Sequence, residues 1–444
     1  MFKIILLLSF IFAQASFASE QSFPSDFQWC VATSAHQIEG NNFNSDWWDW
    51  EQLSGKIKNG DRSGASTNHR QLFVQDVELL KQLHVKTYRM GLEWARIEPS
   101  EGVIDWHEVD LYKQELQLYK ANGIKVMATL QHFTLPKWVA AKGGWQWSEM
   151  PKRFAQFSAL MASQYGSLVD SWITLNEPMV LLLAGYQNGL FPPGLKMNLQ
   201  DMQAPLVNML KAHALAYHQI KSIAGVSSKI GVAHHLRIFD AYNRLNPLDQ
   251  IAAKIASKNF NWAFVNAMET GILQMSIPGQ LKIDQEIPGL KSTQDFIGIN
   301  YYSRDRVQFT PGGPQAFALH TTEGAELSDL GWEIYPKGLY RLLKKISRRF
   351  PNKDILITEN GIADAKDAKR SQFMLEHLTQ VQRAIDKGIR VKGYCHWSLM
   401  DNFEWAEGFT PRFGLFEVDY VTFARTPRPS ALLFAKIAGS NSLE

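Results

Sequence analysis

The chain has 444 residues, of which 45% are hydrophobic and 20% are charged. This composition provides enough apolar surface for a packed core and excludes a mostly disordered chain. The 46 basic and 43 acidic residues give a formal net charge of +3 without long basic runs. A nucleic-acid partner is therefore not expected.

The first predicted element is a secretory signal peptide over residues 1–18. Lys3 precedes an apolar stretch, and small residues stand at Ser16 and Ala18, which is typical of cleavage after Ala18. A membrane anchor is the alternative, but the stretch is shorter than the ~20 apolar residues that a span requires. No stable membrane span is expected later in the chain. We therefore expect a secreted or periplasmic protein that starts near Ser19.

The remaining residues, 19–444, are expected to form a single domain, because no low-complexity linker or short repeat interrupts them. The only two cysteines, Cys30 and Cys395, do not make a disulfide framework. Each lies in an apolar run, where a buried, inert thiol is the expected state, although the sequence does not decide whether they are free.

Short apolar runs typical of buried strands alternate with amphipathic stretches typical of helices. The expected strands lie at 27–35, 85–94, 124–133, 171–178, 229–235, 295–302, 354–361 and 391–399. The clearest helical stretches between them lie at 68–83, 108–123 and 209–222. Eight such strands favour a closed (β/α)8 TIM barrel, of the α/β class, over an open sheet.

Polar residues gather where the apolar runs end. In a (β/α)8 barrel the carboxyl ends of the strands form the active face, so these residues are expected to lie together. They are Gln37, Glu39, Arg89, His132, Asn176, Glu177, Asn300, Tyr302, Glu359, Asn360 and Trp397.

Besides Glu39, two of these residues are carboxylates: Glu177 at the end of the fourth run and Glu359 at the end of the seventh. Paired carboxylates at one rim suggest glycoside hydrolysis, with retention if they lie about 5 to 5.5 Å apart and inversion at roughly 6.5 to 9.5 Å. A structural ion pair with Arg or Lys is the alternative role for each. A nearby negative charge raises a carboxyl pKa, so Glu177 beside an ionised Glu359 is suited to donate a proton.

Five motifs make the resemblance specific: TSAHQIEG, TLNEP, GINYYS, TENG and HWSLMDNFEWAEGF. Together they resemble glycoside hydrolase family 1, the beta-glucosidase and beta-galactosidase family. The resemblance extends from about Phe23 to the segment RFGLFEVDY, which is almost the whole mature chain.

The resemblance implies a two-step double displacement with retention. Glu359 is implied to be the nucleophile and Glu177 the general acid/base. Asn176 is implied to bind the sugar 2-hydroxyl. Catalytic support is implied for Arg89, Asn176, Asn300 and Tyr302.

The resemblance also implies a sugar-binding set, namely Gln37, His132, Asn176, Trp397, Glu404, Trp405 and Phe413. Glu39, by contrast, is assigned a structural role. The Glu404–Trp405 pair argues against a phosphorylated sugar, because a carboxylate would repel a 6-phosphate. No metal or organic cofactor is expected, since His234 and His235 are adjacent in a strand and point to opposite faces.

The aglycone side departs from the family pattern. Met179 follows the NEP motif where tryptophan is common, and we interpret it, with Trp332, as part of a pocket for alkyl or aryl groups. Packing at a helix start is the competing role for Met179.

The expected substrates are small beta-glycosides of unphosphorylated glucose, galactose or fucose, with an O-glycosyl hydrolase of the beta-glucosidase type as the first expectation. A carbohydrate-binding pseudoenzyme is an alternative, but it predicts loss of a catalytic carboxylate, and both are present. Transglycosylation is the nearer competitor, because the covalent intermediate can pass to an alcohol instead of water. The sequence predicts no particular oligomeric state.

Overall fold

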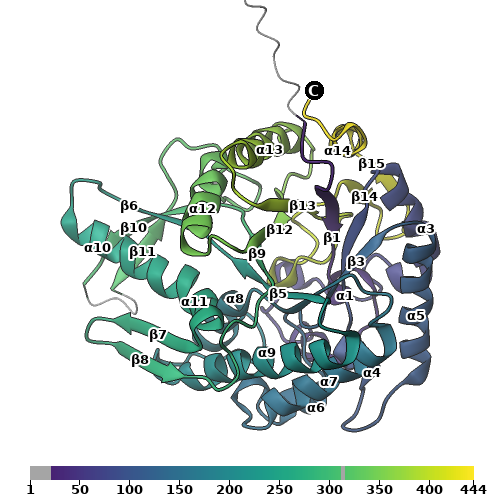
Figure 1. Cartoon of the computed structure of the whole chain (residues 1–444), viewed down its shortest axis with the longest axis horizontal. Coiled ribbons are helices and arrows are strands. Elements are labelled where there is room, and N and C mark those ends of the chain that lie inside the picture. Colours follow the sequence, from purple (N-terminus) through teal and green to yellow (C-terminus); the bar gives the residue numbers. More distant parts are fainter. Residues whose placement is uncertain (1–21, 312–315) are drawn as a thin grey trace, which may run out of the picture.

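The structure is a computed structural model that describes residues 22–311 and 316–444. The expected signal peptide, residues 1–18, lies outside the described residues. The described chain folds around a closed barrel that is surrounded by helices, with a smaller group of strands and helices to one side (Figure 1).

All eight expected strands are present, and they close into one parallel barrel in the order β1-β13-β12-β9-β5-β4-β3-β2. The predicted (β/α)8 fold is confirmed. Their bounds are β1 Gln28–Ala32, β2 Thr87–Gly91, β3 Lys125–Thr129, β4 Ser171–Asn176, β5 Lys229–His235, β9 Phe296–Asn300, β12 Asp354–Asn360 and β13 Val391–Trp397.

The strands are buried on both sides, as their continuous apolar runs predict. One apolar cluster belongs to five of the barrel strands and consists of Met127, Ile173, Ala233, Phe296 and Leu356. A much larger cluster joins the barrel to the surrounding helices.

The expected state of the cysteines is wrong, because Cys30 and Cys395 form a disulfide. They are 365 residues apart in sequence, but barrel closure makes β1 and β13 neighbours. The register then sets Cys30 directly opposite Cys395. The bond therefore joins the first and last strands of the barrel.

The longer helices that follow the strands are α3 His69–Gln82, α5 Trp106–Ala121, α7 Met150–Tyr165, α9 Gln203–Ala224, α11 Ala263–Thr270, α12 Pro336–Arg349, α13 Arg370–Asp386 and α14 Pro429–Ser440. The three predicted helical stretches correspond to α3, α5 and α9. At the start of α5, Asp105 accepts hydrogen bonds from the amides of His107 and Glu108, which caps the helix.

Further helices lie in the loops: α1 Ala35–Ile38, α2 Asp46–Trp50, α4 Trp94–Ile97, α6 Lys137–Ala141, α8 Pro178–Leu181 and α10 Pro247–Ala256. A π-helical turn at Leu182–Gln187 continues α8, and another at Ser257–Trp262 continues α10. The segment after Glu177 is thus helical from its first residue.

Three small sheets flank the barrel. Strands β6 Ile238–Ala241, β10 Arg304–Phe309 and β11 Phe317–His320 form one, β7 Ile272–Ile277 and β8 Leu281–Glu286 form a hairpin, and β14 Phe416–Val418 and β15 Arg425–Pro427 form another. The first two lie beside α10 and α11 (Figure 1).

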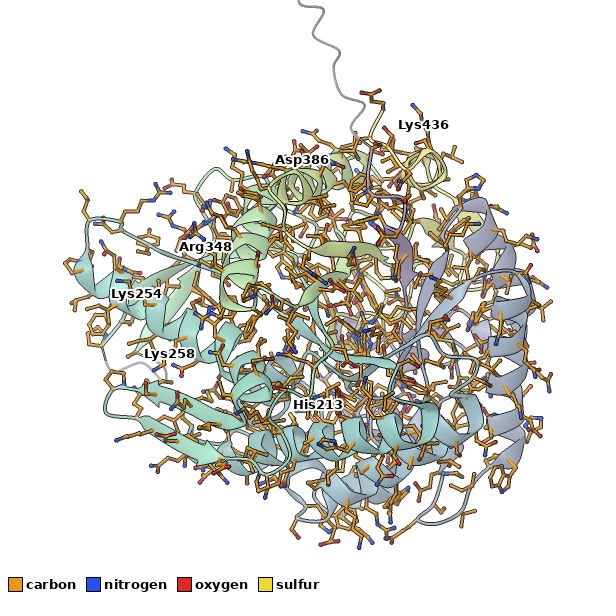
Figure 2. The ribbon with its side chains drawn as sticks, in the orientation of Figure 1. His213, Lys254, Lys258, Arg348, Asp386 and Lys436 are labelled. Atoms are coloured by element: carbon orange, nitrogen blue, oxygen red, sulfur yellow. A yellow bond between two sulfur atoms is a disulfide. The ribbon has the colours of Figure 1, made fainter. Side chains whose placement is uncertain are left out.

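Charged side chains cover the outside of the molecule. Lys254, Lys258, Arg348, Asp386 and Lys436 are exposed, whereas His213 lies inside (Figure 2). No helix among residues 22–311 and 316–444 combines the length and apolar character that crossing a membrane requires.

Candidate active site

The polar residues that end the barrel strands come together at one rim, as predicted. Arg89 lies in β2, Asn176 ends β4, Asn300 ends β9 and Glu359 lies in β12, with Glu177 directly after β4. All five are buried. Buried polar groups require partners, and these residues supply them to one another.

Glu359 is held by two donors. Nη1 of Arg89 donates to its Oε1, and the hydroxyl of Tyr302 donates to its Oε2 at 2.6 Å. Arg89 is itself fixed, because Nε donates to Thr129 at 3.2 Å and Nη1 to the Thr358 carbonyl at 3.0 Å. The carboxyl of Glu359 therefore has one defined orientation.

Glu177 has a different pair of partners. Its Oε1 accepts from Nδ2 of Asn300 at 2.8 Å and lies 3.1 Å from Nδ1 of His235. Its backbone has φ 47° and ψ 55°, in the left-handed region. This geometry turns the chain sharply from β4 into α8 and leaves the carboxyl at the rim.

Asn176 connects the surroundings of the two carboxyl groups. Its Oδ1 accepts from Nη2 of Arg89 at 2.7 Å and from Nδ2 of Asn300 at 3.1 Å. Since Arg89 also holds Glu359 and Asn300 also holds Glu177, one continuous chain of hydrogen bonds links both carboxylates.

The side-chain amide of Asn176 donates to Nε2 of His132 at 2.9 Å. Burial, and to a lesser extent Arg89, lower the pKa of His132, so this ring is neutral and Nε2 is its acceptor. Its buried Nδ1 has no hydrogen-bond partner. A neutral ring with a free Nδ1–H can donate to a sugar hydroxyl.

Burial raises the pKa of both carboxyl groups, and their partners oppose it to different extents. At Glu177 the charge and hydrogen bond of His235, together with Asn300, outweigh burial and lower the pKa. At Glu359 burial and the charge of Glu177 prevail over Arg89 and Tyr302, so its pKa is raised. The expectation from the sequence is the opposite, a raised pKa at Glu177 beside an ionised Glu359. It did not include His235 as a partner of Glu177.

The expected sugar-binding residues lie next to this pair. Nε1 of Trp397 donates to Oε1 of Glu404 at 3.1 Å. Gln37 donates from Nε2 to Asn402 at 2.8 Å and to the Phe403 carbonyl at 2.9 Å. Burial raises the pKa of Glu404 to about 8, so this group is mostly neutral at pH 7 and its charge repels a phosphate less than the sequence analysis expects.

Aromatic rings form one side of the site. The ring of His132 stacks on Trp405 with centroids 5.7 Å apart and lies 5.7 Å from Trp397. In a second aromatic group, the ring centroid of Trp332 lies 5.6 Å from that of Tyr302 and 6.3 Å from that of Phe413. Flat apolar faces of this kind suit the C–H surface of a sugar ring.

Two further expectations concern residues near the rim. Glu39 has the structural role assigned to it, because it pairs with Arg96 at 2.6 Å and accepts from Tyr112 at 2.7 Å. His234 and His235 do point to opposite faces of β5, but the sequence analysis missed that His235 contacts Glu177. Its place at the end of a barrel strand was the available signal.

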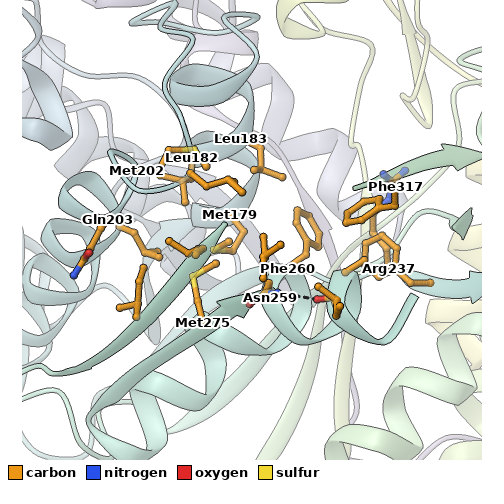
Figure 3. Close-up of a pocket in the computed structure, with 18 of the residues that line it drawn as sticks. Met179, Leu182, Leu183, Met202, Gln203, Arg237, Asn259, Phe260, Met275 and Phe317 are labelled. Carbon is orange, nitrogen blue, oxygen red and sulfur yellow. Dashed lines mark hydrogen bonds between the residues drawn. The ribbon is translucent and has the colours of Figure 1, made fainter. Parts of the chain in front are cut away.

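Met179, two residues after Glu177 in the sequence, lines an apolar cavity (Figure 3). The cavity lies between the segment after β4, the β7–β8 hairpin and the helical segment around Phe260. Its lining includes Leu182, Met275 and Ile283, with Arg237 at one end. Phe260 also contacts the ring of His235 at 5.9 Å, so the cavity directly adjoins the partner of Glu177.

A parallel barrel whose rim carries two linked, buried carboxyl groups next to stacked indole and imidazole rings defines an enzyme that acts on sugars. Comparison with known proteins agrees. The glycosyl hydrolase family 1 model matches residues 19–443. The chain belongs to glycosyl hydrolase family 1, and the predicted class, an O-glycosyl hydrolase, is confirmed.

Relatives match along almost their whole length. Beta-glucosidase A of Thermotoga maritima is 32% identical over 96% of this chain and 99% of its own. A beta-galactosidase of Pyrococcus woesei is 32% identical over 95% and 98%. The solved structure of a beta-glycosidase from Pyrococcus horikoshii has a TM-score of 0.88 at 36% identity and covers 96% of both chains.

Proposed function

We propose that this protein is a retaining beta-glycosidase in which Glu359 is the nucleophile and Glu177 the general acid/base. The supporting observation is the hydrogen-bond chain through Arg89, Asn176 and Asn300, which links the two carboxyl groups. The donors of Glu359 orient it toward one reacting centre, whereas Glu177 has a partner with which it can exchange a proton.

The reaction has two displacements. An oxygen of Glu359 attacks the anomeric carbon, the bond to the leaving oxygen breaks, and that oxygen takes a proton from Glu177. Water then attacks the same carbon, gives its proton to Glu177, and the ester bond to Glu359 breaks. Two inversions at one carbon retain the beta configuration.

The sugar is unphosphorylated glucose, galactose or fucose. Gln37, Trp397 and Glu404 supply hydrogen bonds and an apolar face, and no Lys or Arg is among these residues to neutralise a phosphate. Relatives named beta-glucosidase and beta-galactosidase support both of the first two sugars. A panel of aryl beta-glycosides tests this choice.

The aglycone is an alkyl or aryl group rather than a second sugar. The cavity lined by Met179, Leu182 and Phe260 supports this preference, because its lining is almost entirely apolar and apolar burial favours a hydrocarbon. We expect octyl glucoside to have a higher kcat/KM than cellobiose. A strong preference for cellobiose would contradict the proposal.

The protein is secreted or periplasmic. Its first 18 residues have the pattern of a signal peptide, and the Cys30–Cys395 disulfide is typical of an oxidising compartment. N-terminal sequencing of the protein from the periplasm or medium should begin at Ser19, whereas a chain that starts at Met1 in the cytoplasm would contradict this.

Replacement of the nucleophile tests the catalytic roles. Glu359→Ala should lose nearly all turnover, and added azide should restore a product with the alpha configuration, because azide then attacks the open face of the sugar. A rescued beta product, or full activity without azide, would contradict the assignment of Glu359.

Glu177→Ala provides the matched variant. Dinitrophenyl glycosides leave without protonation and should keep their first step, while alkyl glycosides should lose it. An equal loss with both classes would contradict the role of Glu177.

The ratio of free sugar to transferred product, measured on the wild type with added alcohols, separates hydrolysis from transglycosylation.

A further inference from the structure

His235 occupies a position that the two-carboxylate mechanism does not use. It ends β5, and its Nδ1 lies 3.1 Å from Oε1 of Glu177. The side chains are 11% and 8% exposed, respectively. This contact is therefore largely removed from water, and a hydrogen bond in such surroundings is stronger than one in water.

The ring of His235 is held on two sides. It stacks on Tyr302, with centroids 5.8 Å apart and planes 19° apart, and Phe260 packs edge-on against it at 5.9 Å. Because Tyr302 also donates to Glu359, the imidazole contacts Glu177 directly and packs against a hydrogen-bond donor of Glu359. Its orientation is fixed by packing before any substrate binds.

His234 shows what a purely structural histidine looks like on this strand. It is buried, its ring lies 5.9 Å from Phe264, and its Nε2 has no hydrogen-bond partner. Burial lowers its pKa to about 3. The two adjacent histidines thus have opposite environments, and only His235 faces a carboxyl group.

A single proton between Nδ1 and Oε1 can belong to either group. When it leaves Nδ1, the N–H bond breaks and an O–H bond forms on Glu177, and the net charge of the pair does not change. Burial raises the pKa of Glu177, and the ring of His235 lowers it. A proton on Glu177 removes the charge that raises the pKa of Glu359.

Other charged groups also face the ring. Asp305 of β10 lies near enough for His235 to affect it, and Arg237 pairs with Asp305 at 3.1 Å. Tyr302 reaches the ring from the segment after β9. Arg237 partly neutralises Asp305, so Glu177 remains the one carboxylate in hydrogen-bond contact with the ring among the described residues.

We propose that His235 is a positioning residue for the acid/base: its Nδ1 fixes the carboxyl of Glu177 and exchanges with it the proton that the leaving group receives. This proposal rests on the proposed role of Glu177. It adds that Nδ1 of His235 and Oε1 of Glu177 share one proton across their 3.1 Å contact.

Three variants test the proposal. His235→Phe keeps the ring against Tyr302 and Phe260 but removes both nitrogens. His235→Asn keeps an amide near the position of Nδ1 but cannot ionise. His234→Phe is the matched control on the opposite face of the strand. Each is assayed for kcat/KM against pH with an alkyl glucoside and with a dinitrophenyl glucoside.

We expect His235→Phe to lower kcat/KM for the alkyl glucoside by about tenfold or more, because proton donation is impaired. The dinitrophenyl glucoside should stay within about threefold, since its leaving group needs no proton. Because His235 lowers the pKa of Glu177, its removal should raise that pKa, and the alkaline limb for the alkyl glucoside should move to higher pH. His235→Asn should recover part of the rate but keep the displaced limb.

A second measurement does not depend on turnover. The imidazole nitrogens of His235, observed by NMR at one pH, should have different chemical shifts in Glu177→Gln and in the wild type, because the variant lacks the carboxylate that contacts Nδ1. Unchanged chemical shifts, or equal losses with both substrates and an unmoved limb in His235→Phe, would overturn the proposal. The same displaced limb in His234→Phe would also overturn it. If the wild type hydrolyses aryl glycosides and Glu359→Ala does not, such results would leave the proposed function intact.

Discussion

Tyr302 donates a 2.6 Å hydrogen bond to Oε2 of Glu359, on the carboxyl oxygen that Arg89 does not contact. Each oxygen of this buried carboxyl group therefore has its own donor. Because Arg89 lies in β2 and Tyr302 in the segment after β9, a change in one leaves the other in place. This separation allows their contributions to be measured independently.

Tyr302→Phe should lower kcat by about tenfold to a hundredfold, because one charge-assisted hydrogen bond is worth roughly 1.5 to 3 kcal/mol. The ring remains, so packing against His235 and Trp332 should be kept. Steady-state kinetics with an aryl glucoside checks the rate, and an unchanged melting temperature is the control. An unaltered kcat would contradict an orienting role for the hydroxyl.

Arg89→Lys should lower kcat/KM by about a hundredfold or more, because an ammonium group cannot reproduce the planar fork of the guanidinium. Arg89 contacts Glu359 and Asn176 through different nitrogens, and lysine can serve only one of them well. The variant is compared with Arg96→Lys, a change in an ion pair with Glu39. Similar losses of activity in both would indicate a general folding defect instead.

His69 should make stability depend on pH. Burial alone would lower its pKa, but hydrogen bonds with Asp76 at 2.7 Å and Glu115 at 3.0 Å raise it to about 10. A raised pKa stabilises the fold fully below the unfolded value of about 6.5, and this stabilisation is lost as the pH rises through about 10.

His69→Gln should therefore reduce the free energy of unfolding by a few kcal/mol at pH 6 and by much less at pH 10. Urea denaturation at the two values measures the difference. His218→Gln, a change of an exposed histidine on α9, is the control. An equal loss for His69→Gln at both pH values would show that the charge of His69 contributes nothing.

The disulfide between β1 and β13 should stabilise the closed barrel. Replacing Cys30 and Cys395 together by alanine should cost about 2 to 5 kcal/mol, because the unfolded chain loses a long cross-link. Thermal denaturation with and without a reductant measures this loss. The reductant should lower the melting temperature of the wild type and leave that of the double variant unchanged, and an effect on both would contradict the explanation.

The barrel was predictable because its strands are continuous apolar runs that end in polar residues. The same pattern located Arg89, Asn176 and Glu359, since the carboxyl ends of parallel strands meet at one rim. Contacts that form only when the first and last strands of the barrel meet were not predictable. The disulfide depends on the register of β1 against β13, which no local pattern contains.

The partner of Glu177 was missed for a related reason. His235 and Glu177 belong to neighbouring strands, but a strand pattern gives only the face of a residue and not the reach of its side chain. The direction in which each carboxyl pKa is shifted depends on that contact and on burial. Which of the two carboxyl groups has the raised pKa is therefore set by the assembled structure and not by the local sequence.

The left-handed backbone conformation of Glu177 lowers the stability of the folded protein. A residue with a side chain pays roughly 1 to 2 kcal/mol for this conformation, and glycine does not. Glycine at this position would therefore give a more stable barrel that lacks the acid/base, whereas alanine would keep the conformational penalty and also lack the carboxyl group. In this family member, the fold gives up stability at the residue that donates the proton.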